Sequence, residues 1–371
     1  MIIMSAEIVR KVVENLDEKM EEQNLGNPFF ADTRYKTYPF LKGNFKPIKQ
    51  TETSRKIAFV DGGNQEVLAA PNFSVQINRV YHNIFEAKKR VLKGSFPNRL
   101  EFFSATRSSF RNGEIFYDTT LFPLKDEFME LLPDKVDLSF NSLDRTVTIG
   151  TMRADISGVA SIARRFAEWK YASHVLRKEL ESGDIMVLDG SLQTSFTNEA
   201  NYSNELYEVA KSKGVIVTGI SKTCRLFTDT GLSLLGAVRK LADGTPHSSW
   251  YFPVAEATSS DHNAIIYIIK LHPKAESVFR FEIYREQFLG LSEDDLDEIL
   301  GQLAQNSQDV GFLGYPYGLV DADRFARVRD DELNGYQILL LSEISKQGKW
   351  PKFARHIHAV DAHATLNMLV G

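Results

Sequence analysis

Acidic residues follow two continuous apolar runs of the sequence, and these two positions are the best candidates for chemistry. Asp61 comes directly after residues 57–60, Asp189 comes directly after residues 185–188, and a glycine follows each. If the two runs form neighbouring parallel strands, both carboxylates reach the sheet edge at which open α/β proteins bind ligands. Two close carboxylates repel each other unless a divalent cation lies between them, and oxygen ligands suit Mg²⁺ or Mn²⁺. Each Asp-Gly pair alone is equally compatible with an ordinary strand-to-turn junction.

The chemistry expected of such a site is hydrolysis of a phosphodiester. Two metal ions roughly 4 Å apart would activate a water molecule and stabilise the leaving oxygen. The sequence has no Gly-x-x-x-x-Gly-Lys-Ser/Thr loop to cradle a nucleotide, which argues against ATP-driven phosphotransfer. Lys222 follows the apolar run 215–220 and is open to two interpretations, a contact to the scissile phosphate or a solvated lysine.

Two further acids are ambiguous from pattern alone. Helical spacing places Glu168 opposite the apolar stripe that contains Phe166, which predicts a solvated surface acid. Asp323 falls in a predicted helix after the Tyr-Pro-Tyr turn that begins at Tyr315, and an exposed acid or helix cap explains it equally well. The single cysteine, Cys224, excludes an internal disulfide and a cysteine-based zinc site, and no histidine partner supports a nucleophilic role.

Positive charge is concentrated in residues 34–112, which hold fifteen Lys or Arg against five acids, about +10 within a net charge of -5. Aromatic residues are interleaved with these cations: Tyr35, Tyr38, Phe40, Phe45, Phe73, Tyr81, Phe85 and Phe96. Such a segment would neutralise phosphates and stack bases, as nucleic-acid surfaces do. A solvated basic face with its aromatics in the core is the alternative interpretation.

The elements that must position these residues alternate between strand and helix, which predicts an α/β fold. Helices are expected over 5–24, from Ser157 to about Glu181, over 201–213 and 293–306, around Asp323, and in two closing segments. Strands are expected over 57–60, 67–80, 100–106, 146–149, 185–189, 215–220, 264–271 and 277–284, with a long connection over 26–53. The strand, helix and strand between 185 and 220 predict a right-handed parallel crossover.

Composition is that of a globular protein: 371 residues, 43% hydrophobic and 25% charged. No run approaches the roughly 18 apolar residues of a membrane span, and the first residues lack the apolar core of a secretory signal. We therefore expect one elaborated α/β domain in the cytoplasm, with no membrane partner.

An ordered set of motifs resembles the NurA nucleases over roughly residues 56–328. The matching segments are residues 57–63, 164–168, 187–192, 219–223, 279–282, 314–317 and 322–324. The resemblance implies a ribonuclease H-like mixed sheet flanked by helices and a Mn²⁺-dependent 5′ to 3′ DNA nuclease. It also implies a ring-like homodimer that partners the hexameric translocase HerA in DNA end resection.

The resemblance also assigns roles to residues. Asp61, Glu168 and Asp189 match the metal-binding acids of the family, and Tyr315 and Asp323 match its late Tyr and its late His or Asp. Two departures are visible: Gly-Gly follows Asp61 where Gly-Ser is common, and Asp323 stands where His is frequent. An Asp there still suits Mn²⁺, but it removes a possible general acid or base.

These observations combine into one expectation. Asp61, Glu168, Asp189 and Asp323 would bind two Mn²⁺ or Mg²⁺ ions, with Lys222 and Tyr315 completing a DNA exonuclease and single-strand endonuclease site. The nuclease domain would span 51–330, between an N-terminal helix and connection (1–50) and a C-terminal helical segment (331–371). The competing hypotheses are a non-catalytic DNA-binding scaffold and an actin- or sugar-kinase-like ATP-handling protein. His356, His358 and His363 fit a tail helix with surface histidines better than a metal cluster.

Overall fold

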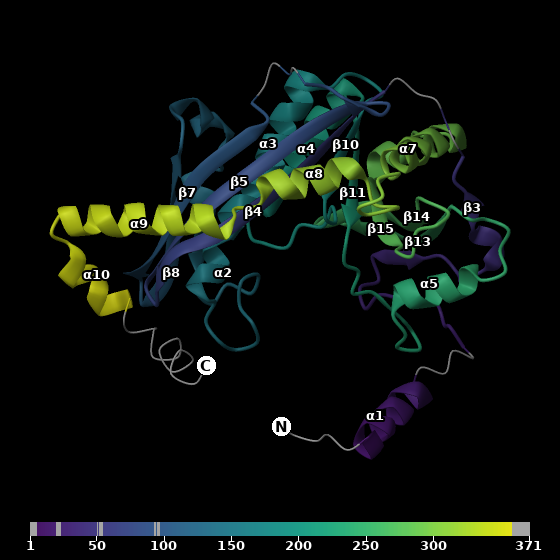
Figure 1. Ribbon diagram of the computed structural model, residues 1–371, viewed down its shortest axis with the longest axis horizontal. Helices are drawn as coiled ribbons and strands as arrows, with labels where there is room; N and C mark the ends of the chain where they lie inside the picture. Colours follow the sequence, from purple (N-terminus) through teal and green to yellow (C-terminus); the bar gives the residue numbers. More distant parts are fainter. Residues whose placement is uncertain are drawn as a thin grey trace.

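The computed structural model describes residues 6–19, 24–49, 51, 55–92, 94 and 97–357, and within them a large mixed sheet dominates (Figure 1). The strands are β1 (Pro28–Phe29), β2 (Tyr35–Thr37), β3 (Lys46–Pro47), β4 (Lys56–Ala70), β5 (Phe73–Glu86), β6 (Lys89–Arg90), β7 (Arg99–Arg111), β8 (Glu114–Pro123), β9 (Ser139–Asn141), β10 (Ile185–Asp189), β11 (Ile216–Ser221), β12 (Phe227–Thr228), β13 (Trp250–Ser259), β14 (His262–Lys270) and β15 (Phe279–Tyr284). The helices are α1 (Ala6–Lys19), α2 (Ile156–Ala160), α3 (Ile162–Glu179), α4 (Glu199–Lys213), α5 (Leu234–Ala242), α6 (Arg285–Phe288), α7 (Glu293–Asn306), α8 (Tyr317–Ala326), α9 (Asp330–Lys346) and α10 (Trp350–Ile357).

The sheet has its only parallel pairings, among the described strands, at its centre. Its order is β2-β13-β14-β15-β11-β10-β4-β5-β7-β8-β9, and β10 runs parallel to both β4 and β11. The other neighbours are antiparallel, including the long hairpin of β4 and β5 and the β14–β15 pair. The parallel unit of β10, α4 and β11 confirms the predicted strand-helix-strand arrangement.

Both faces of the central strands are buried, which explains why their sequences are apolar without alternation. Ala58, Val60, Met186 and Leu188 face a core shared with α3 and α4. The alternate residues Ile57, Phe59, Ile185 and Val187 face a second core shared with α7 and α8. The central strands are therefore held between two helical layers, and the acids of β4 and β10 lie where the parallel pairing ends.

The structure corrects several expected boundaries. No turn follows Asp61, because β4 continues to Ala70 in register with β5. Residues 146–149 form a turn and irregular chain, not a strand. Asp155 rather than Ser157 caps α2, and this helix ends at Ser161 before α3 begins. The segment 26–53 contains three short strands, and β13 had no counterpart in the expected elements.

The last helices run along the long strands of the sheet. Figure 1 shows α8 lying across β4 and β5, with α9 following it along the same side. Val328 and partly buried residues of α9 pack with Val67 and Ile77. None of the helices in the described part of the chain is long and apolar enough to cross a membrane.

Candidate metal centre

Three carboxylates from distant parts of the chain converge at one edge of the central strands. Asp61, Asp189 and Asp323 come from β4, β10 and α8, and one oxygen of each lies within 4.8 Å of the others. The side chains of Asp61 and Asp189 are both 12% exposed, whereas that of Asp323 is 55% exposed. The cluster is therefore buried on the sheet side and open to solvent on the helix side.

Strand register brings the first two acids together. The parallel pairing of β10 with β4 joins residues 185–188 to residues 57–60, so Asp61 and Asp189 are both the next residue beyond it. Asp61 thus lies where its parallel neighbour ends, although its own strand continues. Both acids share the carboxyl edge of parallel strands as expected, although β4 continues beyond residue 60, where the strand was expected to end.

Helix α8 delivers the third acid because it packs unusually close to β4. A Cβ atom at Gly318 would collide with the ring of Phe59, so glycine permits this approach. Asp321 fixes the helix from the buried side, where its carboxylate accepts from Asn83 Nδ2 at 2.9 Å and pairs with Arg90 at 3.1 Å. Asp323, two residues further, then projects over the strand ends.

The Lys222 ammonium occupies the space between the three carboxylates. Its Nζ lies 2.6 Å from Asp189 Oδ2, 2.7 Å from Asp323 Oδ1 and 4.0 Å from Asp61 Oδ2. Burial works to lower the pKa of Lys222, but the carboxylates, Asp189 first, outweigh it and raise that pKa. The lysine is therefore charged and serves as a monovalent counter-ion for the acids.

This single positive charge does not balance the cluster. Burial, followed by the negative charges of Asp189 and Glu168, raises the pKa of Asp61 from 3.8 to about 9, while Lys222 acts in the opposite direction. Asp61 consequently holds a proton at neutral pH unless more positive charge arrives. Three convergent carboxylates with only one ammonium among them fit a hard divalent cation such as Mg²⁺ or Mn²⁺.

Glu168 is buried next to this cluster, which corrects the surface position predicted from helical spacing. It is 8% exposed, and a Cβ atom at Gly62 would collide with its carboxylate. Arg164 donates to Glu168 Oε1, and Arg165 Nη1 lies 3.8 Å from Oε2. Helical spacing failed because arginine side chains, rather than water, solvate this carboxylate. Glu168 lies outside the group of three whose oxygens converge.

Tyr315 lines the floor of the site. It is 1% exposed, and its hydroxyl has no hydrogen-bond partner among the described residues. Lys222 Nζ lies 5.9 Å from the centre of its ring. Burial first, then the charges of Asp189 and Asp61, raise the pKa of the phenol, so Tyr315 stays protonated and can act as a donor.

Other candidates from the sequence fare differently. Burial raises the pKa of Cys224, which disfavours the thiolate that a nucleophile requires. Phe45, Tyr81 and Phe85 are all buried, so they cannot stack on bases. Phe96, His358 and His363 lie outside the described residues, and His356 belongs to α10.

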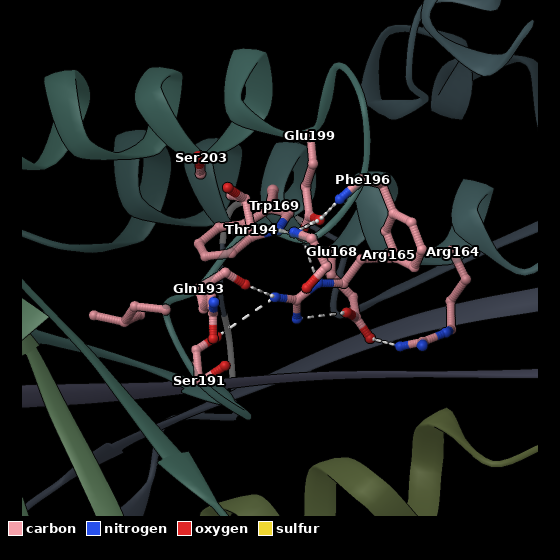
Figure 2. A network of polar contacts seen from close by, with 12 residues as sticks. Arg164, Arg165, Glu168, Trp169, Ser191, Gln193, Thr194, Phe196, Glu199 and Ser203 are labelled. Carbon is pink, nitrogen blue, oxygen red and sulfur yellow. Dashed lines mark hydrogen bonds and ion pairs between the residues drawn. The ribbon is translucent and has the colours of Figure 1, made fainter. Parts of the chain in front are cut away.

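Sequence reasoning missed a polar network behind the site, shown in Figure 2. Arg165 and the fully buried Glu199 bridge α3 and the segment that follows Asp189. The available signal was the spacing of Arg164 and Arg165, four and three residues before Glu168, which puts all three on adjacent turns of a helix. Glu199 gave no signal of its ion pair, because Arg165 and Trp169 lie in a different helix, 34 and 30 residues away in the chain.

Comparisons with known proteins support a nuclease. The model of the NurA domain matches residues 55–328. The crystal structure of the NurA nuclease from Sulfolobus solfataricus is similar with a TM-score of 0.52 at 13% identity, covering 93% of this chain and 95% of that one. Endonuclease V of Ciona intestinalis, solved with a 24mer DNA containing inosine, covers 74% and 84% at 11% identity, with a TM-score of 0.36. A comparison with curated proteins gave no match.

The match over residues 55–328 contains Asp61, Glu168, Asp189 and Asp323, together with Lys222 and Tyr315. The mixed sheet flanked by helices is of the ribonuclease H-like type, as the family resemblance implied. The family match therefore covers the strands and helices that build the acidic cluster, and the chain belongs to the NurA nuclease family.

Proposed function

We propose that this protein is a metal-dependent DNA nuclease whose active site is the acidic cluster. The observation that carries the proposal is the convergence of Asp61, Asp189 and Asp323 within 4.8 Å around a lysine ammonium. These three carboxylates, with Glu168 beside Asp61, would hold two Mn²⁺ or Mg²⁺ ions. Divalent cations there would supply an activated water and stabilise the leaving oxygen of the phosphodiester.

The chain's own residues perform the remaining tasks. Lys222 reaches the cluster from the end of β11, so its ammonium would offset negative charge on a phosphate bound there. The hydroxyl of Tyr315 is protonated and has no protein partner among the described residues, but it is buried, so it would act from inside the protein rather than touch the DNA strand. The exposure of Asp323 leaves the helix side open for DNA to enter.

The basic segment 34–112 would provide a surface that binds the phosphate backbone of DNA. Lys88 and Lys89 are exposed and, with Lys49, line a hollow of about 1500 Å³. Phe45, Tyr81 and Phe85 belong to the core, so these three aromatics contribute no base stacking, and the exposed lysines supply charge.

Finer aspects of the proposal follow the family resemblance. We propose 5′ to 3′ exonuclease and single-strand endonuclease activities, a homodimer, a HerA-type hexameric translocase as partner, and a cytoplasmic role in end resection. We place the nuclease domain at residues 51–330, which contain every residue assigned to the site.

Cleavage of end-labelled single- and double-stranded DNA with and without Mn²⁺ tests the function. Asp189→Asn should abolish cleavage and leave the fold intact, because the residue lies at a strand end outside the apolar core. Glu205→Gln is the control, since Glu205 pairs with Arg177 at 2.7 Å between α3 and α4, outside both the acidic cluster and the basic segment. Salt-sensitive DNA binding without cleavage under Mn²⁺, Mg²⁺ or Co²⁺ would instead indicate a non-catalytic DNA-binding protein.

A further inference from the structure

Residues 190–198, between β10 and α4, connect Asp189 to the rest of the molecule. This segment is not a regular element, so its buried backbone groups need partners from elsewhere. Leu192 N donates to Glu282 Oε2 at 2.7 Å, and Gly190 N donates to Ile220 O at 2.8 Å. These contacts hold the first half of the segment against β11 and β15.

A buried ion pair helps to hold the second half of the segment, beside contacts of Thr194 with Asp261 and of Thr197 with Asp144. Glu199 accepts from the backbone N–H groups of Ser195 at 2.7 Å and Phe196 at 3.1 Å. The same carboxylate accepts from Arg165 Nε and from Trp169 Nε1, both at 2.8 Å. With four donors around a side chain of 0% exposure, the charge of Glu199 is fully compensated.

The guanidinium of Arg165 has contacts on three sides (Figure 2). Besides Glu199, its Nη2 donates to Ser191 O at 3.4 Å and to Gln193 O at 3.2 Å. Its Nη1 lies 3.8 Å from Glu168 Oε2. Arg165 therefore connects the backbone two residues beyond Asp189 to the carboxylate of Glu168.

Arg164 makes the complementary connection on the other side of Glu168. It donates to Glu168 Oε1, and the same Nη1 donates to Gly62 O at 3.3 Å, next to Asp61. Glu168 is thus tied through one arginine to the strand that carries Asp61, and through the other to the segment that follows Asp189.

We infer that Arg165 and Glu199 are positioning residues that set the placement of Glu168 and Asp189 for cation binding. The inference rests on the proposed metal-dependent function. Outer contacts of this kind orient metal ligands, and their loss usually costs about 10- to 100-fold in metal affinity or activity. A planar guanidinium can donate to a carboxylate and two carbonyls at once, whereas a lysine ammonium at the same position cannot reproduce that geometry.

The test compares Arg165→Lys with Arg177→Lys. Arg177 is a matched control because it also joins α3 to α4, through Glu205 at 2.7 Å, but at the surface and away from the acids. Both variants keep the positive charge. For each, Mn²⁺ affinity is measured by calorimetry, and kcat and KM for a single-stranded DNA are measured at a temperature well below both unfolding midpoints.

We expect Arg165→Lys to weaken Mn²⁺ binding and to lower kcat, each by about tenfold or more, with KM for DNA changed less than about twofold. Arg177→Lys should match the wild type in Mn²⁺ affinity, kcat and KM. Equal Mn²⁺ affinity and kcat in the two variants would overturn the inference. Glu199→Gln provides a second test if Arg165→Lys does not fold. The glutamine amide places an NH₂ donor where the carboxylate accepts hydrogen bonds, so this variant should lose Mn²⁺ affinity and kcat to the same extent.

The same measurements separate this inference from the proposed function. A wild-type protein that neither binds Mn²⁺ nor cleaves DNA would refute the function itself. A wild type that does both, beside an Arg165→Lys variant that is equally active, would refute only the positioning role.

Discussion

At the scale of single residues, the negative charges of the site are only partly balanced. Three carboxylates share one lysine ammonium, and the pKa of Asp61 rises to about 9 because burial and its acidic neighbours disfavour its ionised form. Lys222 and a divalent cation would compete for the same carboxylate oxygens. Both features lead to measurable predictions for the cation-free and cation-bound states.

Lys222→Met should tighten Mn²⁺ binding by about tenfold or more while reducing cleavage. Two unit charges 4 Å apart near a protein surface interact by about 4 kcal/mol, so removal of the competing ammonium outweighs a tenfold change, about 1.4 kcal/mol. Calorimetric titration with Mn²⁺ measures the affinity. Lys46→Met is the control, because Lys46 makes a 2.6 Å pair with Glu293 at the surface. Unchanged or weaker Mn²⁺ binding in Lys222→Met would contradict the competition.

The raised pKa of Asp61 predicts a pH dependence of stability. The folded protein retains a proton that the unfolded chain releases near 3.8, so the free energy of unfolding should fall as pH rises from about 4 to about 9, then level off. Asp61→Asn should remove this part of the dependence, and so should saturating Mn²⁺. Urea unfolding in a chelator between about pH 5 and pH 9 measures it. Identical slopes for Asp61→Asn and the wild type would show that Asp61 titrates normally.

At the scale of elements, the site depends on how closely α8 approaches β4. Gly318 of α8 lies against Phe59, which is itself 0% exposed in the core between the sheet and its helices. Asp321 anchors the same helix to β5 through Asn83. The position of Asp323 is thus set by packing two turns or less away from it, not by contacts of its own backbone with the strands.

Gly318→Ala should therefore destabilise the protein and impair the site together. The added methyl meets the buried Phe59 ring, and overpacking of this kind costs about 1 to 3 kcal/mol. Gly335→Ala in α9 is the control, because nothing lies within 4 Å of its Cβ position and the change favours a helix by about 1 kcal/mol. Thermal unfolding and Mn²⁺ titration of both variants provide the comparison. A Gly318→Ala protein as stable as the wild type, with full Mn²⁺ affinity, would show that α8 can shift freely.

At the scale of the whole molecule, charge is distributed unevenly over a chain of net charge -5. The segment 34–112 is basic, and it forms the long strands β4, β5 and β7 as well as short strands at the opposite edge of the sheet. Its cations are therefore spread along the sheet rather than gathered at the acids. Such a distribution favours contact with an extended polyanion.

Lys88→Gln combined with Lys89→Gln should weaken DNA binding and reduce its salt dependence. Each lost phosphate contact lowers the slope of log affinity against log salt by about 0.7 to 0.9, so the double variant should lose between about 1 and 2. Lys125→Gln with Lys135→Gln, two exposed lysines outside the segment, is the control. Binding titrations at several salt concentrations give the slopes. Equal slopes in both double variants would exclude Lys88 and Lys89 from the DNA surface.

The sequence alone determined the elements that are governed by local patterns. The apolar runs before Asp61 and Asp189 are visible because burial on both faces gives a continuous apolar run. The helix Glu293–Asn306 and the β14–β15 pair are visible as further apolar patterns of helical and strand type. The family resemblance added Glu168 and Asp323, which periodicity had treated as surface acids.

Only the tertiary structure decided how these residues combine. The continuation of β4 past Asp61 depends on its pairing with β5, and the burial of Glu168 depends on two arginines folded over it. Glu199 acquires its partners from a loop and from another helix. The β4–β5 pairing and the Arg165–Glu199 ion pair join residues far apart in the chain, so no local period records them. Arg164 and Arg165 lie within about one helical turn of Glu168, but this spacing becomes burial only when α3 packs against β4, so the geometry of the acids exists only in the folded molecule.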